Sequence, residues 1–219
     1  MRIDVFTLTP HAYAWMTEQQ PIAGVLGGEL ELRLFNYRDT TPLRAGQVDD
    51  TPYGGGAGMV LRVDVVAQAL DAAYGTDDLN QAGSKHRVIA LTPQGRPLTQ
   101  EIVEEFAQED ELTLLSSRFE GFDDRIVQHL CNDSVSIGPY VLSNGDLAAM
   151  VLLDAVGRRL PGALAEGSGE LESFSAELDG ALEYPHYTRP AEFRGWSVPD
   201  VLLSGDHAKI ESWRREHVR

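Results

Sequence analysis

The sequence predicts an α/β protein, with a parallel β-sheet domain followed by a small helical C-terminal domain. Short apolar runs alternate with helical stretches of about 10–15 residues, a pattern typical of parallel strands joined by crossover helices. Three of these runs end in glycine-bearing turns, which punctuate strand-to-helix connections. Between Pro161 and Glu170 the chain becomes glycine-rich and acidic, which indicates a linker.

The strands are predicted from apolar runs of strand length. Residues 29–35 alternate leucine with charged residues, as expected of a strand with one buried face. The other expected strands are short, apolar and rich in Val, Ile, Leu and Thr, which favours burial on both faces. They cover residues 2–9, 86–91, 112–115 and 135–137.

The helices are predicted from the longer segments between these runs. A helix is expected after the first strand, ending at the Gln19-Gln20-Pro21 break, and a strongly apolar one is expected over 146–160. Further helices are expected over 62–74, 98–108, from Gly121 to about residue 131, and 207–217. Residues 38–59 show no periodicity and contain a run of glycines, so a loop is expected there.

Charge is distributed unevenly along the chain. The 219 residues carry 18 Lys+Arg against 34 Asp+Glu, a formal charge of −16, which argues against diffuse binding to a polyanion. Residues 181–219 hold six basic and six acidic side chains, so the whole excess lies in residues 1–180. Any nucleic-acid contact must therefore use a local surface. Arginine would provide most of its cations, because the chain has only two lysines, Lys85 and Lys209.

Several protein classes are excluded by missing signals. The single cysteine, Cys131, allows no internal disulfide, and neither a phosphate-binding loop motif nor a zinc-ligand spacing occurs, so no metal site is expected. No apolar run approaches the roughly 18 residues of a membrane helix. Asp4 interrupts the start of the chain before the apolar region of a secretion signal could form. A cytoplasmic location without membrane contact is therefore expected.

Three turns suggest a shared ligand pocket. They cover residues 91–95, 117–121 and 136–145, each at the carboxyl end of an expected strand. Ligands of open parallel sheets lie beyond these ends, where tight turns let backbone groups reach them. Any one turn alone is better interpreted as a plain strand-to-helix connection, but three together favour a pocket. Its peptide N–H and C=O groups would suit the edge of an adenine.

A resemblance to a known family rests on long motifs in a fixed order. Val48 to Met59 (VDDTPYGGGAGM) resembles the signature loop of the TrmD family of bacterial tRNA (guanine-N1)-methyltransferases. The three turns follow in the family's order, and after them Asp154–Arg158, Pro161-Gly162 and Glu172–Phe174. Further matches are EYPHYTRP at 183–190, VPDVLLSGDH at 198–207 and IESWRR at 210–215, so the resemblance covers nearly the whole chain.

The resemblance implies an architecture and a reaction. It implies a knotted SPOUT methyltransferase domain over 1–160 with a C-terminal trefoil knot, an interdomain linker over 161–180 and a short helical tRNA-binding domain over 181–219. It further implies S-adenosylmethionine as methyl donor, bound by the knot's turns, and a homodimer with a shared active site. The implied substrate is tRNA carrying guanosine 36-guanosine 37, methylated at N1 of guanosine 37. Magnesium dependence is also implied, without a dedicated protein site.

The resemblance also assigns individual residues. Glu172 matches the general base and Arg158 the catalytic arginine. The matches to cofactor-binding positions are Leu91, Thr92, Pro93, Ser117, Glu120, Ser136, Ile137, Gly138, Pro139, Tyr140, Val141, Leu142 and Gly145. The matches to substrate-binding positions are Asp50, Arg118, Glu120, His186 and Arg189.

The expected chemistry explains why these residue types are needed. Guanine N1 carries a proton, so a carboxylate must remove it and a cation must stabilise the charge that develops on O6. The base must also leave the stack to be reached. Each residue has a plainer interpretation as well. Glu172 could be a solvated linker acid, Arg158 an i,i+4 partner of Asp154, and His186 a packed or capping side chain.

Departures from the family pattern leave an alternative open. Ser117 and Pro139 stand where the family usually has Gly and Asp, and Asn144-Gly145-Asp146 where it has Gly-Gly-Glu. A side chain at 117 and a missing N–H at 139 fall on the cofactor turns. The alternative is therefore a tRNA-binding paralogue with weakened or lost cofactor turnover. A knotted methyltransferase acting on another RNA is a second alternative.

Overall fold

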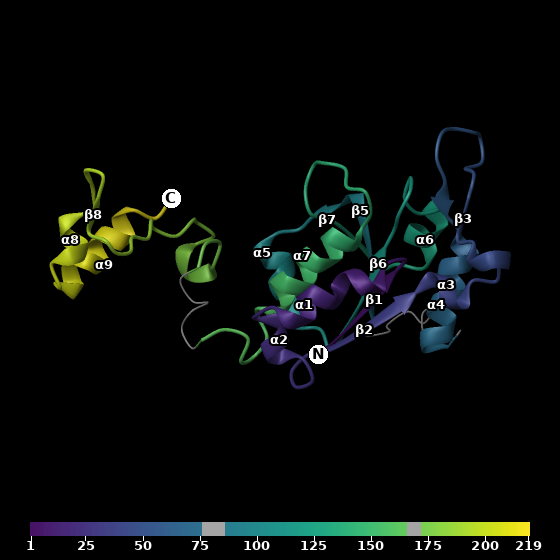
Figure 1. The fold of residues 1–219 in the computed structure, drawn as a ribbon, viewed down its shortest axis with the longest axis horizontal. Helices are drawn as coiled ribbons and strands as arrows, with labels where there is room; N and C mark the ends of the chain where they lie inside the picture. Colours follow the sequence, from purple (N-terminus) through teal and green to yellow (C-terminus); the bar gives the residue numbers. More distant parts are fainter. Residues whose placement is uncertain (76–85, 166–171) are drawn as a thin grey trace. The chain divides into compact units, whose positions relative to one another are not determined.

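The structure, a computed structural model, describes residues 1–75, 86–165 and 172–219. It divides into two compact units, Met1–Leu164 and Ala165–Arg219. The first unit contains a five-stranded, wholly parallel sheet in the order β2-β1-β6-β5-β7, which confirms the predicted α/β class (Figure 1). Its strands are β1 (Arg2–Thr7), β2 (Glu31–Asn36), β5 (Arg87–Pro97), β6 (Glu111–Ser116) and β7 (Asp133–Ser136).

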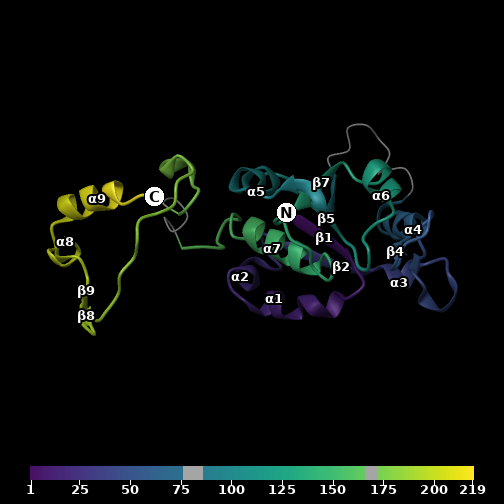
Figure 2. The same ribbon diagram turned by 90° about the horizontal axis from the view of Figure 1, so that it is seen from above.

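Helices cover both faces of this sheet (Figure 2). One layer comprises α1 (Ala14–Glu18), α2 (Ile22–Val25), α5 (Gln100–Ala107) and α7 (Asp146–Gly157). The other comprises α3 (Tyr37–Thr40), α4 (Val63–Tyr74) and α6 (Asp124–His129). Strand β1 supplies Ile3 and Val5 to the first layer and Phe6 to the second, and all three are fully buried. Burial on both faces explains why the apolar residues of β1 are not confined to one face of the strand.

The helical stretch predicted before Pro21 is confirmed, and it consists of a 3-10 turn, η1 (Pro10–Tyr13), followed directly by α1. Two other predictions for the first unit were wrong in detail. The loop expected over 38–59 includes most of α3, the turn η2 (Arg44–Gly46) and strand β3 (Asp49–Asp50), which pairs with β4 (Val60–Leu61). These elements have two to five residues, too few for a periodicity to show. The strand expected to end at residue 91 continues to Pro97 as β5, across the predicted turn.

The second unit is small and mostly exposed. It contains the turn η3 (Ala176–Leu178), the hairpin β8 (Glu192–Phe193) and β9 (Trp196–Ser197), and the helices α8 (Asp200–Leu203) and α9 (His207–Glu216). Helix α9 confirms the helix predicted near 207–217, and Asp206 caps it by accepting from the Lys209 backbone N–H. Of the predicted linker 161–180, residues 166–171 lie outside the described residues.

Candidate active site at the carboxyl ends of the strands

The predicted pocket lies where β5, β6 and β7 end. A cavity of about 160 Å³ opens there, between the turns that follow these strands. Its lining comprises Leu91, Thr92, Pro93, Ser117, Arg118, Phe119, Glu120, Gly121, Val135, Ser136, Ile137, Gly138, Tyr140, Val141, Leu142, Ser143, Asn144, Gly145 and Ala148. The structure thus brings together the predicted cofactor residues, with the exception of Pro139, which belongs to the same loop but not to the lining. Arg118 and Glu120, predicted to hold substrate, line it too.

Backbone contacts tie the three turns to one another. The Gly145 N–H donates to the Ser117 carbonyl over 2.8 Å, and Arg118 and Asn144 pair as an antiparallel bridge. A Cβ at Gly145 would lie 3.1 Å from the Ser117 nitrogen, so the two turns approach too closely for a larger residue to fit without movement. The Ser136 carbonyl accepts from the Leu98 N–H over 2.8 Å. The cavity is therefore lined by segments of fixed relative position.

The glycine-rich loop between β3 and β4 reaches the wall of the cavity. The Glu120 N–H donates to the Met59 carbonyl over 2.9 Å, and a Cβ at Gly58 would lie 2.3 Å from the Glu120 carboxylate. Gly58 also has a φ of +83°, a conformation that residues with a side chain rarely adopt. Asp50, at the start of this loop, lies outside the cavity lining and accepts a hydrogen bond from Arg62 at 3.1 Å. Glycine at 58 is thus what allows the loop to approach Glu120.

We expect Gly58→Ala to displace the Glu120 carboxylate and to lower activity at least tenfold. The new methyl group would overlap the carboxylate, and the positive φ would be strained. The methyl transfer that the family resemblance implies, assayed at steady state with the melting temperature as a check of folding, measures the effect. Gly27→Ala is the matched control, because Gly27 also has a positive φ but open space around its Cβ. Equal losses in both variants would show that strain, and not the Glu120 contact, is responsible.

A buried acid anchors the helix that follows the third turn. Asp146, only 5% exposed, accepts hydrogen bonds from Thr7 (2.6 Å), Tyr13 (3.1 Å) and Thr9. Burial and the nearby Asp146 carboxyl raise the pKa of Tyr13 well above its usual range, so the phenol keeps the proton that it donates. The Asn144 side chain accepts from the Asp146 N–H over 3.0 Å. The side chains of Asn144 and Asp146 thus fix the start of α7.

We expect Asp146→Ala to destabilise the protein by about 3 kcal/mol, because it leaves buried hydroxyl donors without an acceptor. Urea unfolding measures the loss. Tyr13→Phe removes only one donor and should cost about 1 kcal/mol. If the two variants were equally stable, the anchoring role of Asp146 would be refuted.

The remaining predicted residues lie at the end of α7 and in the second unit. Arg158 is the C-cap residue of α7. Glu172 is half-buried, and its carbonyl accepts from the Ser175 N–H at 3.0 Å. His186 is exposed and contacts the Glu183 carboxylate at 3.0 Å and the Tyr184 ring at 4.9 Å, while Arg189 is exposed. Their catalytic and binding roles stay predictions.

Some lining residues were missed by the sequence reasoning. Phe119, Gly121, Ser143 and Asn144 belong to the very turns that predicted the pocket, so membership of the turn was the available signal. Val135 and Ala148 carry no such signal, because one is a buried strand residue and the other lies on α7. The anchoring role of Asp146 could not be predicted, because its hydrogen-bond partners Thr7, Thr9 and Tyr13 are far away in the sequence.

The residues that the structure describes contain no group of three or more His, Cys, Asp or Glu side chains placed to hold a metal ion. Within the same residues, no helix is both long and apolar enough to cross a bilayer.

The fold and site define a class: an α/β protein with a cavity between fixed turns at the carboxyl edge of a parallel sheet, the place where folds of this class bind their ligands. The model of the family described as "tRNA (Guanine-1)-methyltransferase TrmD" matches residues 1–219. The chain therefore belongs to this family, whose members are enzymes that use S-adenosylmethionine.

Named relatives agree with this assignment. The chain is 49% identical over 216 residues to a tRNA (guanine-N(1)-)-methyltransferase of Brevibacillus brevis, covering 98% of this chain and 85% of the relative. The chain is also 46% identical to a protein of the same name from Exiguobacterium sibiricum and 44% identical to one from Dehalococcoides mccartyi. Each alignment covers 99% of this chain and 85% of the relative.

Proposed function

We propose that this protein transfers a methyl group from S-adenosylmethionine to N1 of guanosine 37 in tRNA that carries guanosine at position 36. The observation that carries the proposal is the convergence of the three predicted turns on one cavity, in a chain of the TrmD family. The tRNA-binding paralogue without turnover is not favoured, since the relatives across the whole chain are named as methyltransferases. Of the two residues that motivated that alternative, Pro139 lies outside the cavity lining and Ser117 lies in it.

The cavity suits the proposed methyl donor. Leu91, Ile137, Val141, Leu142 and Ala148 offer apolar surface to a purine ring, and the turns add backbone N–H and C=O groups for its edge. The Ser136 hydroxyl and the Gly138 backbone bond to each other (3.1 and 3.3 Å), and the Tyr140 hydroxyl donates to the Ile137 carbonyl (3.0 Å), which stiffens this wall. When bound, S-adenosylmethionine supplies an electrophilic methyl group. The family resemblance further implies that these turns belong to a trefoil knot.

The protein's own side chains would handle the proton and the charge. Glu172 removes the N1 proton of the flipped guanine, and the Arg158 guanidinium stabilises the negative charge that develops on O6. Glu120 accepts hydrogen bonds from the guanine edge at the cavity, and Arg118 holds the neighbouring nucleotide. Asp50, His186 and Arg189 contact RNA or close the site. Magnesium would act without a dedicated protein site.

A homodimer is part of the proposal and is supported by α7. Leu147 and Val151 lie one turn apart on this helix and are 56% and 45% exposed. Tyr140 and Val141 in the preceding loop are also exposed. A helix whose solvent-facing positions are leucine and valine is typical of a surface that a second copy covers.

Methyl transfer from labelled cofactor to an unmodified tRNA transcript with guanosine 36-guanosine 37 tests the proposal. Incorporation should map to N1 of guanosine 37 and vanish in a transcript with adenosine at 37. Calorimetric binding of the cofactor should be micromolar. Incorporation at another nucleotide would overturn the substrate assignment, and absence of cofactor binding would favour the paralogue.

A further inference from the structure

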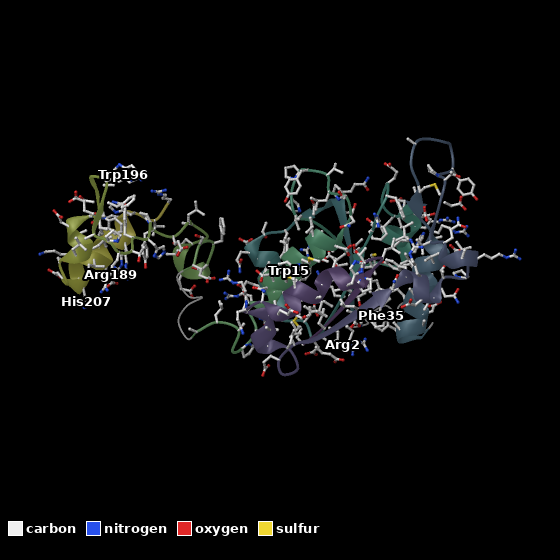
Figure 3. The ribbon with its side chains drawn as sticks, in the orientation of Figure 1. Arg2, Trp15, Phe35, Arg189, Trp196 and His207 are labelled. Atoms are coloured by element: carbon white, nitrogen blue, oxygen red, sulfur yellow. The ribbon has the colours of Figure 1, made fainter. Side chains whose placement is uncertain are left out.

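The β8–β9 hairpin of the second unit presents two aromatic rings to solvent. Trp196 is 71% exposed and Phe193 is 52% exposed, and their ring centroids are 6.0 Å apart. Figure 3 shows Trp196 on this unit, together with Arg189. Residues 191–197 are all exposed, so the hairpin contributes little to the packing of its own unit. Exposing apolar aromatic surface to water costs free energy, and an exposed apolar patch often marks a binding site. The aromatic pair is therefore a candidate for one.

The hairpin is held in a defined shape. Its two-residue turn, Arg194-Gly195, has positive φ at both positions (54° and 83°), the geometry that matches the twist of short antiparallel strands. The Val198 N–H donates to the Ala191 carbonyl over 2.9 Å and closes the base of the hairpin. The Arg194 guanidinium lies over the Phe193 ring, 5.1 Å from its centroid. A cation and two rings are thus grouped at the end of a rigid arm.

The other aromatic residues of this unit behave differently. Trp213 stacks on His217 at 4.1 Å and contacts the Tyr187 ring, and Arg214 lies over Tyr184 at 4.9 Å. These contacts hold α9 to the strand-like segment before the hairpin. The unit therefore has an internal aromatic cluster, and the exposed pair on the hairpin is a separate feature.

The chemistry of the hairpin favours RNA as the partner. Aromatic faces bind unstacked bases of any sequence, and arginine adds both charge and a planar surface. The segment 181–219 has a net charge of zero within a chain of −16, so RNA can approach it more easily than the first unit. Arg189 precedes the two aromatic residues in the sequence, and Arg194 lies between them. The absence of net negative charge on this segment matters for RNA, which is a polyanion, and is not required for a protein partner.

We propose that Trp196 and Phe193 stack on unpaired nucleotides of the tRNA and that Arg194 binds the adjacent phosphate. This proposal rests on the proposed function in that it takes tRNA as the ligand. It assigns a binding surface to residues outside the predicted substrate set, Asp50, Arg118, Glu120, His186 and Arg189. The hairpin would then position the tRNA without taking part in the chemical step.

Equilibrium binding of the full-length protein to a fluorescent tRNA transcript, measured without cofactor, tests this. We expect Trp196→Ala to weaken binding about tenfold, as loss of one stacked base does. Trp196→Phe should restore most of the affinity, while Trp196→Leu should not, since leucine is apolar but cannot stack. Arg194→Gly should weaken binding and reduce its salt dependence. Glycine suits the positive φ at 194 better than arginine, so misfolding would not explain a loss there.

Other results would overturn the proposal. Wild-type affinity in Trp196→Leu, or in Trp196→Ala with intact melting temperature, would exclude stacking. A lower molecular mass of Trp196→Ala in sedimentation would show that the hairpin contacts a second copy instead. Methylation of guanosine 37 is assayed separately. If the variants bind tRNA as tightly as the wild type and methylate it normally, only the role of the hairpin is refuted. If the variants bind tRNA more weakly but the wild type does not methylate it, only the proposed reaction is refuted.

Discussion

Replacing Glu172 by glutamine should reduce methyl transfer at least about 100-fold while leaving cofactor affinity unchanged. A positioned general base contributes about 10²–10⁴-fold, and an amide cannot take the N1 proton of guanine. The side chain is nearly isosteric, so the half-buried turn that Glu172 begins should be preserved. Single-turnover methyl transfer, with calorimetric cofactor titration beside it, measures both quantities.

The matched control is Glu177→Gln. Glu177 is an exposed acid of η3 in the same unit, and its replacement makes the same change in net charge. We expect it to keep wild-type activity. Equal losses in the two variants would mean that Glu172 acts through the overall charge of the unit and not as the base. Full activity in Glu172→Gln would exclude it from the proton transfer altogether.

The sequence predicted the sheet because its strands are buried on both faces. Residues 2–7 and 111–116 lie almost wholly inside and therefore carry apolar side chains toward both faces of the sheet, with Asp4 and Thr113 as buried polar exceptions. The short elements between residues 37 and 61 could not be predicted, because no pattern in their own sequence marks them. They depend on tertiary contacts, such as the burial of Tyr37, Val48 and Leu61 in one cluster, which leave no local pattern.

The part of the cavity lining that consists of glycine-bearing turns could be predicted from the sequence. Glycines and their neighbours mark the places where the chain must bend, and parallel strands bring those places to one edge. The relation between residues distant in sequence was not predictable. Thr7, Thr9 and Tyr13 meet Asp146 across more than 130 positions, and Gly58 meets Glu120 across 62.

Replacing Gly95 by alanine should destabilise the first unit by about 3 kcal/mol and should also markedly lower cofactor affinity. Strand β5 pairs with Val135 twice, through Leu91 and again through Arg96, and the residues between them form a bulge. This bulge brings Thr92 and Pro93 to the cavity. The chain can return to the sheet only by passing close to the β7 backbone.

Gly95 stands at the point of return. A Cβ there would lie 2.4 Å from the Val135 nitrogen and 2.6 Å from the Ser134 carbonyl carbon, and neither backbone atom can move without shifting β7. Overpacking of this kind costs about 1–3 kcal/mol, and displacement of a strand lies at the upper end. Because Val135, Ser136 and Ile137 line the cavity, the same shift would misplace its wall.

Urea unfolding and calorimetric cofactor titration at low temperature, where the variant stays folded, separate the two effects. Gly28→Ala is the control, since its nearest contact would be an ordinary 3.8 Å to the Val25 carbonyl oxygen. We expect that variant to match the wild type in both measurements. If Gly95→Ala were as stable as Gly28→Ala, the close passage of β5 over β7 would not be what fixes the bulge. If it were destabilised but bound the cofactor normally, the bulge would not position the cavity wall, and the proposed cofactor site would have to lie elsewhere.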